Sequence, residues 1–358
     1  MKQIHVVHII PKLGFGGAER FVVELAKHMP SKNIRQSIIT LWDDRPLMKE
    51  LPDSVSCTVF PFDRIGYIHR IPKLTKMLRE MQADIVHTHL FSADLWGRLA
   101  AKSLGIPVVT TEHNINVGES WLWGRIKRAM KKYSRVYTAP SSAVREYMKT
   151  AYGIAVENTR VIMHGIELEH FIKIKPAAFA PPYKLLMMGR MVEQKGHSIA
   201  LDALQKIRDI SCTLTMVGDG EKKESLMHYA KELGVSDRVI WKSATENVSR
   251  EYATADIVLV PSRWEGLGIV VFEALASERL VIGSRVGGIP EIIIDGENGR
   301  LIPVENSDAL ADAIRASVKN QLASKKIAKQ GRVWVKEQGS VARMTEAYEA
   351  LYQEVVKK

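Results

Sequence analysis

The sequence has only two cysteines, Cys57 and Cys212, in a chain of 358 residues. Two cysteines so far apart exclude the disulfide framework of a small secreted protein, so we expect two core residues in a reducing compartment. No apolar run approaches the about 20 residues that cross a bilayer, and the apolar run over residues 4–10 is too short for a secretory signal. Low-complexity stretches are also absent. These absences predict a folded, cytoplasmic protein.

The composition is that of an ordinary globular chain, with 46% hydrophobic and 25% charged residues. A chain of this length exceeds what one hydrophobic core usually organises, so we expect two domains.

The net charge of +11 indicates an anionic partner, which can be a phosphorylated ligand, a nucleic acid or an acidic membrane. Residues 121–135 concentrate cations among apolar side chains and contain no acidic residue. This basic amphipathic pattern predicts contact with an anionic membrane surface at the inner face of the cell membrane. The cations expected to make that contact are Arg125, Lys127, Arg128, Lys131 and Lys132.

Membrane contact is not the only interpretation of this segment. Its apolar stripe can instead pack into the first domain and leave the cations in solvent. We expect no nucleic-acid partner, because the basic residues are not interleaved with a recognisable nucleic-acid-binding fold.

Short β-rich runs alternate with helical patterns along the chain, which predicts doubly wound parallel sheets covered on both faces. The runs expected as strands are residues 4–10, 37–41, 55–60, 84–88, 107–111 and 136–139, then 184–188, 213–217, 239–241, 257–260, 280–283 and 300–302.

Residues 173–183 interrupt this alternation with three prolines and three alanines, which favours an extended linker. We therefore expect a first domain over residues 1–172 and a second over residues 184–340. Ligands of such open sheets bind at the carboxyl ends of the strands, so the site is expected in a central cleft that the two domains face.

Gly16 and Gly17 follow the first expected strand and precede an apolar-periodic helix. Backbone without side chains at a helix start lets an anion or a sugar approach the amides. A tight turn of purely structural importance is the alternative. A dinucleotide cofactor is not expected, because Glu19 stands where that motif needs glycine.

Two cations stand five residues apart on the loop that follows the first strand of the second domain. Arg190 and Lys195 can hold a diphosphate from two sides, one as a planar fork and the other as a point charge. The alternative is that Arg190 and Lys195 are ordinary surface charges in contact with solvent.

Two carboxylates, Glu265 and Glu273, follow the expected strand of residues 257–260 with seven residues between them. Carboxylates accept hydrogen bonds from sugar hydroxyls, and the amides around Gly268 at a helix start can receive an anion. A pair of acids also suits hydrolysis by general acid and base.

Taken in order, these motifs resemble the retaining nucleotide-sugar glycosyltransferases of family 4, which have the GT-B fold of two Rossmann-like domains. The resemblance runs nearly from end to end, and its residues are Gly16-Gly17, His87-Thr88-His89, Thr111-Glu112-His113-Asn114, His164-Gly165-Ile166-Glu167, Gly189-Arg190, Lys195-Gly196, Glu265, Glu273 and Gly287-Gly288-Ile289-Pro290-Glu291.

The resemblance implies a role for each matching residue. Arg190 and Lys195 would bind the donor diphosphate, with Gly16 and Gly17 close to it, and Gly268 and Ile269 would offer amides. Glu273 would bind the ribose and Glu265 the transferred sugar. His113 would lie beside the reacting sugar, so the expected catalytic residues are His113, Glu265, Arg190 and Lys195. The helix of residues 341–358 would pack back on the first domain.

Two positions depart from the family pattern. His164 stands where many members have asparagine, so we expect a structural residue there, and Leu267 stands where an aromatic side chain is common.

We expect no metal ion and no cofactor. His87 and His89 are expected on opposite faces of their strand and lack a cysteine or acidic partner at ligand spacing. No Asp-x-Asp pair is present to chelate a metal-bound diphosphate.

The sequence therefore predicts a hexosyltransferase that uses a nucleotide-sugar, of the UDP-sugar type, and a glycan or lipid-linked acceptor in polysaccharide or glycolipid biosynthesis. The alternatives are a GT-B-like phosphorylase, a nucleotide-sugar epimerase, or a non-catalytic basic membrane-binding protein.

Overall fold

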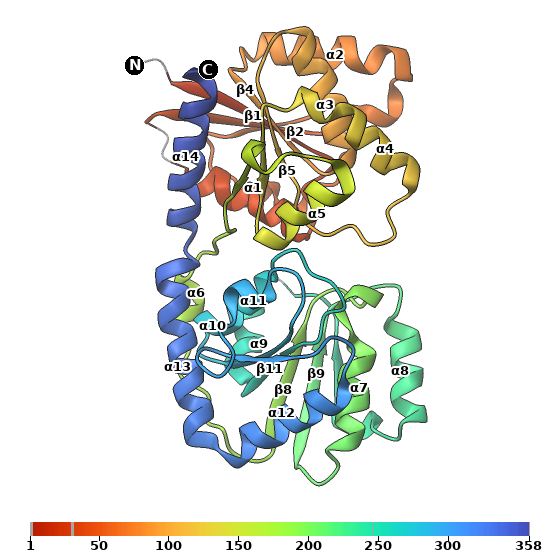
Figure 1. The fold of residues 1–358 in the computed structure, drawn as a ribbon, viewed down its shortest axis with the longest axis vertical. Coiled ribbons are helices and arrows are strands. Elements are labelled where there is room, and N and C mark those ends of the chain that lie inside the picture. The colour runs from red at the N-terminus through yellow and green to blue at the C-terminus, as the bar shows by residue number, and fades with distance from the viewer. Residues whose placement is uncertain (1–2, 30–31, 246, 358) are drawn as a thin grey trace. The chain divides into compact units, whose positions relative to one another are not determined.

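The computed structural model describes residues 3–29, 32–245 and 247–357. Its backbone contacts divide the chain into two compact units, and each unit contains one parallel sheet. Unit 1 comprises Met1–Gly165 and Val341–Lys358, and unit 2 comprises Ile166–Ser340. Figure 1 shows the elements of both units.

Unit 1 has a seven-stranded sheet in the order β3-β2-β1-β4-β5-β6-β7. All of its strand pairs are parallel. Its strands are β1 (Ile4–Ile10), β2 (Ile34–Thr40), β3 (Ser56–Val59), β4 (Ile85–His89), β5 (Val108–Thr111), β6 (Val136–Ala139) and β7 (Thr159–Val161).

Helices cover both faces of this sheet. Successive side chains of each strand point to opposite faces, so apolar residues on both faces are buried by helices. On β1, Val6 and Ile10 join a core with α1 and α14, whereas Val7 and Ile9 join a core with α2 and α3. The helices of unit 1 are α1 (Gly17–His28), α2 (Tyr67–Glu80), α3 (Phe91–Ser103), α4 (Trp121–Met130), α5 (Ser142–Tyr152) and α14 (Val341–Lys357).

Helix α14 is the last element of the chain and packs on unit 1. Its Tyr348, Leu351 and Tyr352 belong to the same core as Phe21 and Leu25 of α1. Its Tyr352 hydroxyl also bonds His87 of β4 at 2.7 Å.

Unit 2 has a six-stranded parallel sheet in the order β10-β9-β8-β11-β12-β13. Its strands are β8 (Tyr183–Met188), β9 (Cys212–Val217), β10 (Val239–Lys242), β11 (Ile257–Val260), β12 (Leu280–Ser284) and β13 (Arg300–Ile302). Its helices are α6 (Glu169–Ile172), α7 (His197–Lys206), α8 (Lys223–Glu232), α9 (Val248–Thr254), α10 (Ile269–Ala276), α11 (Ile289–Ile292), α12 (Ser307–Lys319) and α13 (Gln321–Gln338).

The doubly wound parallel fold is confirmed, and the expected strands correspond to twelve of the thirteen observed within a few residues. The prediction omitted β7, which has three residues at the edge of its sheet, one of them the exposed Arg160. So short a strand carries too little apolar pattern to stand out.

The division between the units lies after Gly165, so α6 belongs to unit 2 rather than to the first domain where we expected it. The expected linker, residues 173–183, packs onto unit 2. Phe179 is buried in its core, and its backbone amide donates to Asp256 at 2.9 Å.

Among the described residues, no helix combines the length and the apolar character that crossing a bilayer requires.

Candidate functional site

The loops after β8 and β11 bring Lys195 and Glu265 together, although 70 residues separate them in the sequence. The Lys195 ammonium lies 2.6 Å from the Glu265 carboxylate. Both side chains are largely buried, and a small pocket lies beside them. Parallel strands end at the same edge of a sheet, so this edge collects both charges.

Backbone and amide contacts hold these two loops together. The Gln194 side-chain amide donates to the carbonyl of Trp264 at 3.0 Å, and the Arg263 amide donates to the carbonyl of Gln194 at 2.8 Å. Gly287, which has φ +55°, lies against the Glu265 carbonyl, where a side chain would collide. The position of Glu265 therefore depends on contacts from two other loops.

Glu273 lies in α10, the helix that follows Glu265 in the chain. Tyr252 of α9 donates its hydroxyl to the Glu273 carboxylate at 2.7 Å. Burial, with the nearby Glu273 charge, holds the pKa of Tyr252 well above its ordinary value, so the phenol stays a donor. Tyr252 thereby orients the carboxylate.

Arg190 and Gly268 complete the predicted residues of unit 2. Arg190 follows β8 with its side chain exposed, and no hydrogen bond or ion pair involves that side chain within the described ranges. Gly268 has φ +95° and directly precedes Ile269, the first residue of α10, so its backbone conformation suits glycine.

Gly16 and Gly17 lie where the sequence predicted them, at the start of α1. Gly16 is the residue before the helix and Gly17 is its first residue. A side chain at Gly16 would collide with the Glu19 carboxylate, which lies in the first helical turn. That carboxylate is the end of a flexible side chain that can move aside, so local packing alone does not require glycine at this position.

His113 follows β5 in unit 1 and contacts other histidines. Its Nε2 lies 3.2 Å from Nδ1 of His89. Its Nδ1 is buried and has no hydrogen-bond partner in the part of the chain that the structure describes. His164 lies beside it, with ring centroids 5.3 Å apart.

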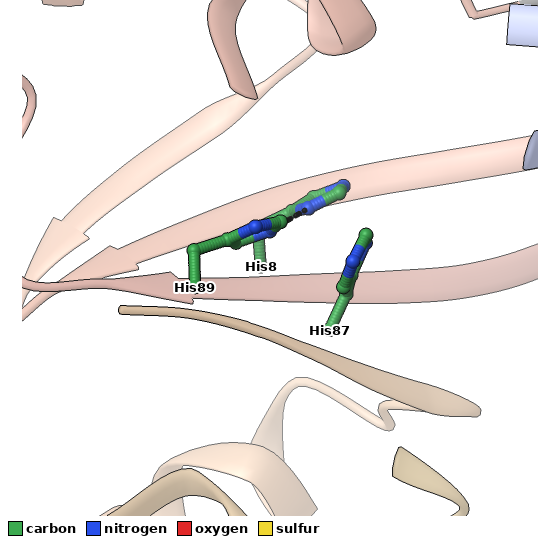
Figure 2. A group of neighbouring side chains, drawn as sticks. All are labelled: His8, His87 and His89. Carbon is green, nitrogen blue, oxygen red and sulfur yellow. Dashed lines mark hydrogen bonds between the residues drawn. The ribbon is translucent and has the colours of Figure 1, made fainter. Parts of the chain in front are cut away.

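The expectation that His87 and His89 point to opposite faces is wrong. Residues two apart on a strand share a face, and their ring centroids lie 4.1 Å apart. His8 of β1 joins them on the face covered by α1 and α14. Figure 2 shows these three side chains together.

The nitrogens of His8, His87 and His89 are close enough to hold a metal ion, within 4.8 Å of one another. They are, however, already hydrogen-bonded. His8 Nδ1 lies 3.1 Å from His89 Nε2, and both ring nitrogens of His87 bond hydroxyls, those of Tyr352 and Thr111, at 2.7 Å. A hydrogen-bonded cluster therefore accounts for the geometry.

Lys127, predicted to face an anionic membrane, is instead buried. Its ammonium lies 2.9 Å from Glu119 and 3.1 Å from Glu112, and it donates to the Tyr152 hydroxyl at 2.9 Å. Its two carboxylate partners hold the pKa of Lys127 above its usual range despite burial. The ion pairs fasten α4 to the loop that follows His113, because Glu112 and Glu119 flank that loop.

The other predicted cations of this segment remain at the surface. Arg125, Arg128, Lys131 and Lys132 are exposed. Of the apolar residues beside them, Met130 is buried, whereas Trp121, Leu122 and Trp123 are exposed. We call these seven exposed residues the α4 surface.

Tyr252, Gln36 and His8 were missed as candidate site residues. Nothing in the sequence distinguishes Tyr252 from a core tyrosine. A signal for His8 existed, since a polar ring within a largely apolar strand needs a buried hydrogen-bond partner, and Gln36 on the neighbouring strand supplies one.

Two family models match consecutive parts of the chain. One, described as Glycosyltransferase Family 4, matches residues 15–170, and the other, described as Glycosyl transferases group 1, matches residues 170–334. Together they cover residues 15–334, which include most of both units but neither β1 nor α14.

Curated relatives are similar over most of their length. An uncharacterized glycosyltransferase of Methanocaldococcus jannaschii is 28% identical, over 77% of each chain. The N-acetyl-alpha-D-glucosaminyl L-malate synthase of Bacillus anthracis is 26% identical, over 80% of this chain and 78% of that protein. Among solved structures, Anabaena HepE in complex with UDP and glucose has a similar fold, with a TM-score of 0.87, 21% identity and coverage of 98% and 100%.

Proposed function

Because the chain belongs to the glycosyltransferases of family 4, with family models matching residues 15–170 and 170–334, we propose that it transfers a hexose-type sugar from a UDP-sugar. The acceptor is a glycan or a lipid-linked sugar, and the anomeric configuration is retained. No metal ion or cofactor takes part.

The contact between Lys195 and Glu265 carries this proposal. A cation that binds phosphate and a carboxylate that binds hydroxyls are what the two parts of a sugar diphosphate require. These two groups neutralise one another. We assign the diphosphate to Lys195 and Arg190, and the hydroxyls of the transferred sugar to Glu265.

The nucleoside is assigned to Glu273, whose carboxylate accepts hydrogen bonds from the ribose hydroxyls. The hydrogen bond from Tyr252 fixes the orientation of this carboxylate. The amides at Gly268 and Ile269, at the start of α10, supply further donors. UDP and glucose in the structure of HepE, a protein of similar fold, support a UDP-sugar as the donor.

The reaction breaks the bond between the anomeric carbon and the diphosphate oxygen and forms a bond to the acceptor oxygen. Negative charge develops on the leaving oxygen, so Arg190 and Lys195 would stabilise the transition state. The acceptor attacks from the face that the diphosphate leaves, and its proton passes to the leaving phosphate. In unit 1, His113 is assigned to the reacting sugar and the Gly16-Gly17 turn to the diphosphate, as in the family.

We further propose that the α4 surface docks on an anionic membrane that carries a lipid-linked acceptor. Four cations beside exposed tryptophan and leucine suit the interface between headgroups and acyl chains. Electrostatic attraction of about 1 kcal/mol for each cation gives reversible binding. Lys127 takes no part, because its charge is neutralised inside the unit.

Calorimetry with a panel of nucleotide-sugars, followed by transfer assays with and without EDTA, tests the function. We expect one UDP-sugar to bind and its sugar to reach an added glycan or lipid acceptor at a rate that EDTA does not change. Conversion of a donor without acceptor would instead indicate an epimerase, and dependence on inorganic phosphate a phosphorylase. Loss of activity in EDTA with recovery on adding magnesium would refute the metal-free mechanism.

A further inference from the structure

A line of hydrogen-bonded side chains runs through the core of unit 1 and ends at His113. Gln36 of β2, His8 of β1 and His89 of β4 are each buried. The contacts are Gln36 Oε1 to His8 Nε2 at 3.1 Å, His8 Nδ1 to His89 Nε2 at 3.1 Å, and His89 Nδ1 to His113 Nε2 at 3.2 Å. Figure 2 shows the central pair, His8 and His89.

Gln36 determines which atom is the donor and which the acceptor in each hydrogen bond of this line. Its Nε2 lies 3.4 Å from the carbonyl oxygen of Leu25 and 3.3 Å from that of Ala26 in α1. Carbonyl oxygens only accept, so the amide nitrogen must face them, and Oε1 must face His8. An oxygen at that position requires a proton on His8 Nε2.

The remaining protons follow one by one. A neutral imidazole protonated on Nε2 has a lone pair on Nδ1, so His8 accepts from His89 Nε2–H. His89 is then protonated on Nε2 and accepts through Nδ1 from His113 Nε2–H. His113 is left with its lone pair on Nδ1, the nitrogen that has no partner among the described residues.

Burial keeps the rings neutral, which this assignment requires. It lowers the pKa of His8 to about 4 and holds the pKa of His89 well below its ordinary value. Neighbouring histidines act in the same direction on His89. Protonation of one of these rings to the cation, which would turn its accepting nitrogen into a donor, is therefore disfavoured at neutral pH.

We propose that Gln36, His8 and His89 are positioning residues that hold His113 in its Nε2–H tautomer and so present its Nδ1 lone pair to a hydroxyl group of bound sugar. The tautomer follows from unit 1 alone, whereas the sugar as its ligand rests on the proposed function.

Histidine nitrogen NMR tests the tautomers on the whole protein at pH 7.5, without substrate. Two-bond proton–nitrogen correlations of ¹⁵N-histidine-labelled protein distinguish the two neutral tautomers from the cation. We expect His8, His89 and His113 all to be neutral and protonated on Nε2. An Nδ1–H tautomer or a cation at His113, or a metal ion bound at stoichiometric amount in the purified protein, would overturn the proposal.

Gln36→Met removes the oxygen that sets the direction while keeping the length of the side chain. We expect the Nδ1–H tautomer of His113 to become populated and kcat/KM to fall by about 10-fold. Ser37→Ala is the matched control, because Ser37 is buried on the same strand and bonds a histidine outside the line, His5, at 2.8 Å. It should change neither the tautomer nor kcat/KM by more than twofold.

A double-mutant cycle distinguishes positioning from a general loss of structure. If Gln36 acts through His113, Gln36→Met should have no further effect on kcat/KM in a His113→Ala background. If the two substitutions instead lower kcat/KM independently, so that their effects multiply, Gln36 does not act through His113. The NMR result stands whether or not a sugar donor is found, so failure of the proposed function and failure of the tautomer assignment remain distinguishable.

Discussion

The ammonium of Lys195 lies 2.6 Å from the carboxylate of Glu265, and neither has another ion-pair partner in the described part of the chain. Both groups are mostly buried, so each depends on the other for neutralisation. A phosphate that binds Lys195 and a hydroxyl that binds Glu265 would replace this internal contact. The contact thus keeps a cation that can bind phosphate beside a carboxylate that can bind hydroxyls.

Replacement of Arg190 should affect catalysis without affecting folding. Its side chain is exposed, so Arg190→Ala should change the free energy of unfolding by no more than about 0.5 kcal/mol. Turnover should fall by about 100-fold or more, as for other groups that stabilise a leaving charge. Lys195→Ala should lower turnover similarly and also destabilise unit 2, because Glu265 loses its partner. Near-normal turnover in both variants would refute the diphosphate assignment.

Glu273→Ala should weaken binding of nucleoside diphosphate. Hydrogen bonds to a charged acceptor contribute about 1.5 to 3 kcal/mol, which corresponds to a dissociation constant raised by about 10- to 150-fold. Tyr252→Phe should give a smaller loss, because the carboxylate remains but its orientation is no longer fixed. Calorimetry with UDP measures both, and an unchanged affinity for Glu273→Ala would remove the ribose assignment.

Lys127→Met should destabilise unit 1 by about 3 to 5 kcal/mol, because it leaves Glu112 and Glu119 with an uncompensated buried charge. Lys132→Met, on the exposed side of the same segment, is the control and should cost no more than about 0.5 kcal/mol. Urea denaturation compares the two. Equal stabilities would show that the Lys127 ion pairs contribute little.

Vesicle sedimentation tests the α4 surface. Binding should require anionic lipid, weaken with salt and drop when Arg125, Arg128, Lys131 and Lys132 are all changed to Gln. The control changes four exposed lysines of unit 2, Lys319, Lys325, Lys326 and Lys329, to Gln, which removes the same charge. Equal loss in both variants, or equal recovery with neutral vesicles, would contradict specific docking through α4.

Stability of unit 1 should decrease as the pH falls from about 6.5 towards 4. Burial lowers the pKa of His8 to about 4 from 6.5, and lowers those of His87 and His89 as well, so the unfolded chain binds more protons in this range. Each such histidine contributes about 1.4 kcal/mol per pH unit, a contribution that is complete above pH 6.5.

Hydrogen exchange of β1 and β4 amides at pH 7.5, 6.0 and 5.0, corrected for intrinsic rates, measures this change. The exposed His228 in unit 2 provides the control, since His228→Gln should not alter the dependence. Opening free energies that stay constant or rise on acidification would show that the cluster is not held neutral.

The candidate site could be predicted from the sequence where local signals coincide. Lys195 and Glu265 each stand on a loop after an apolar strand, and strand ends of a parallel sheet share one edge. Their mutual contact could not be predicted, because it depends on a side-chain direction and on Gly287 and Gln194 from other loops.

The sequence by itself determined the alternation of strands and helices, and with it two parallel sheets with glycines and charges at their ends. Hydrophobic periodicity and glycine placement are local properties, so a single sequence carries them. Only the tertiary structure decided that Lys127 is buried, since its partners Glu112 and Glu119 come from the preceding loop. It also decided that His8, His89 and Gln36 meet, because strand order, not sequence distance, determines which side chains are neighbours.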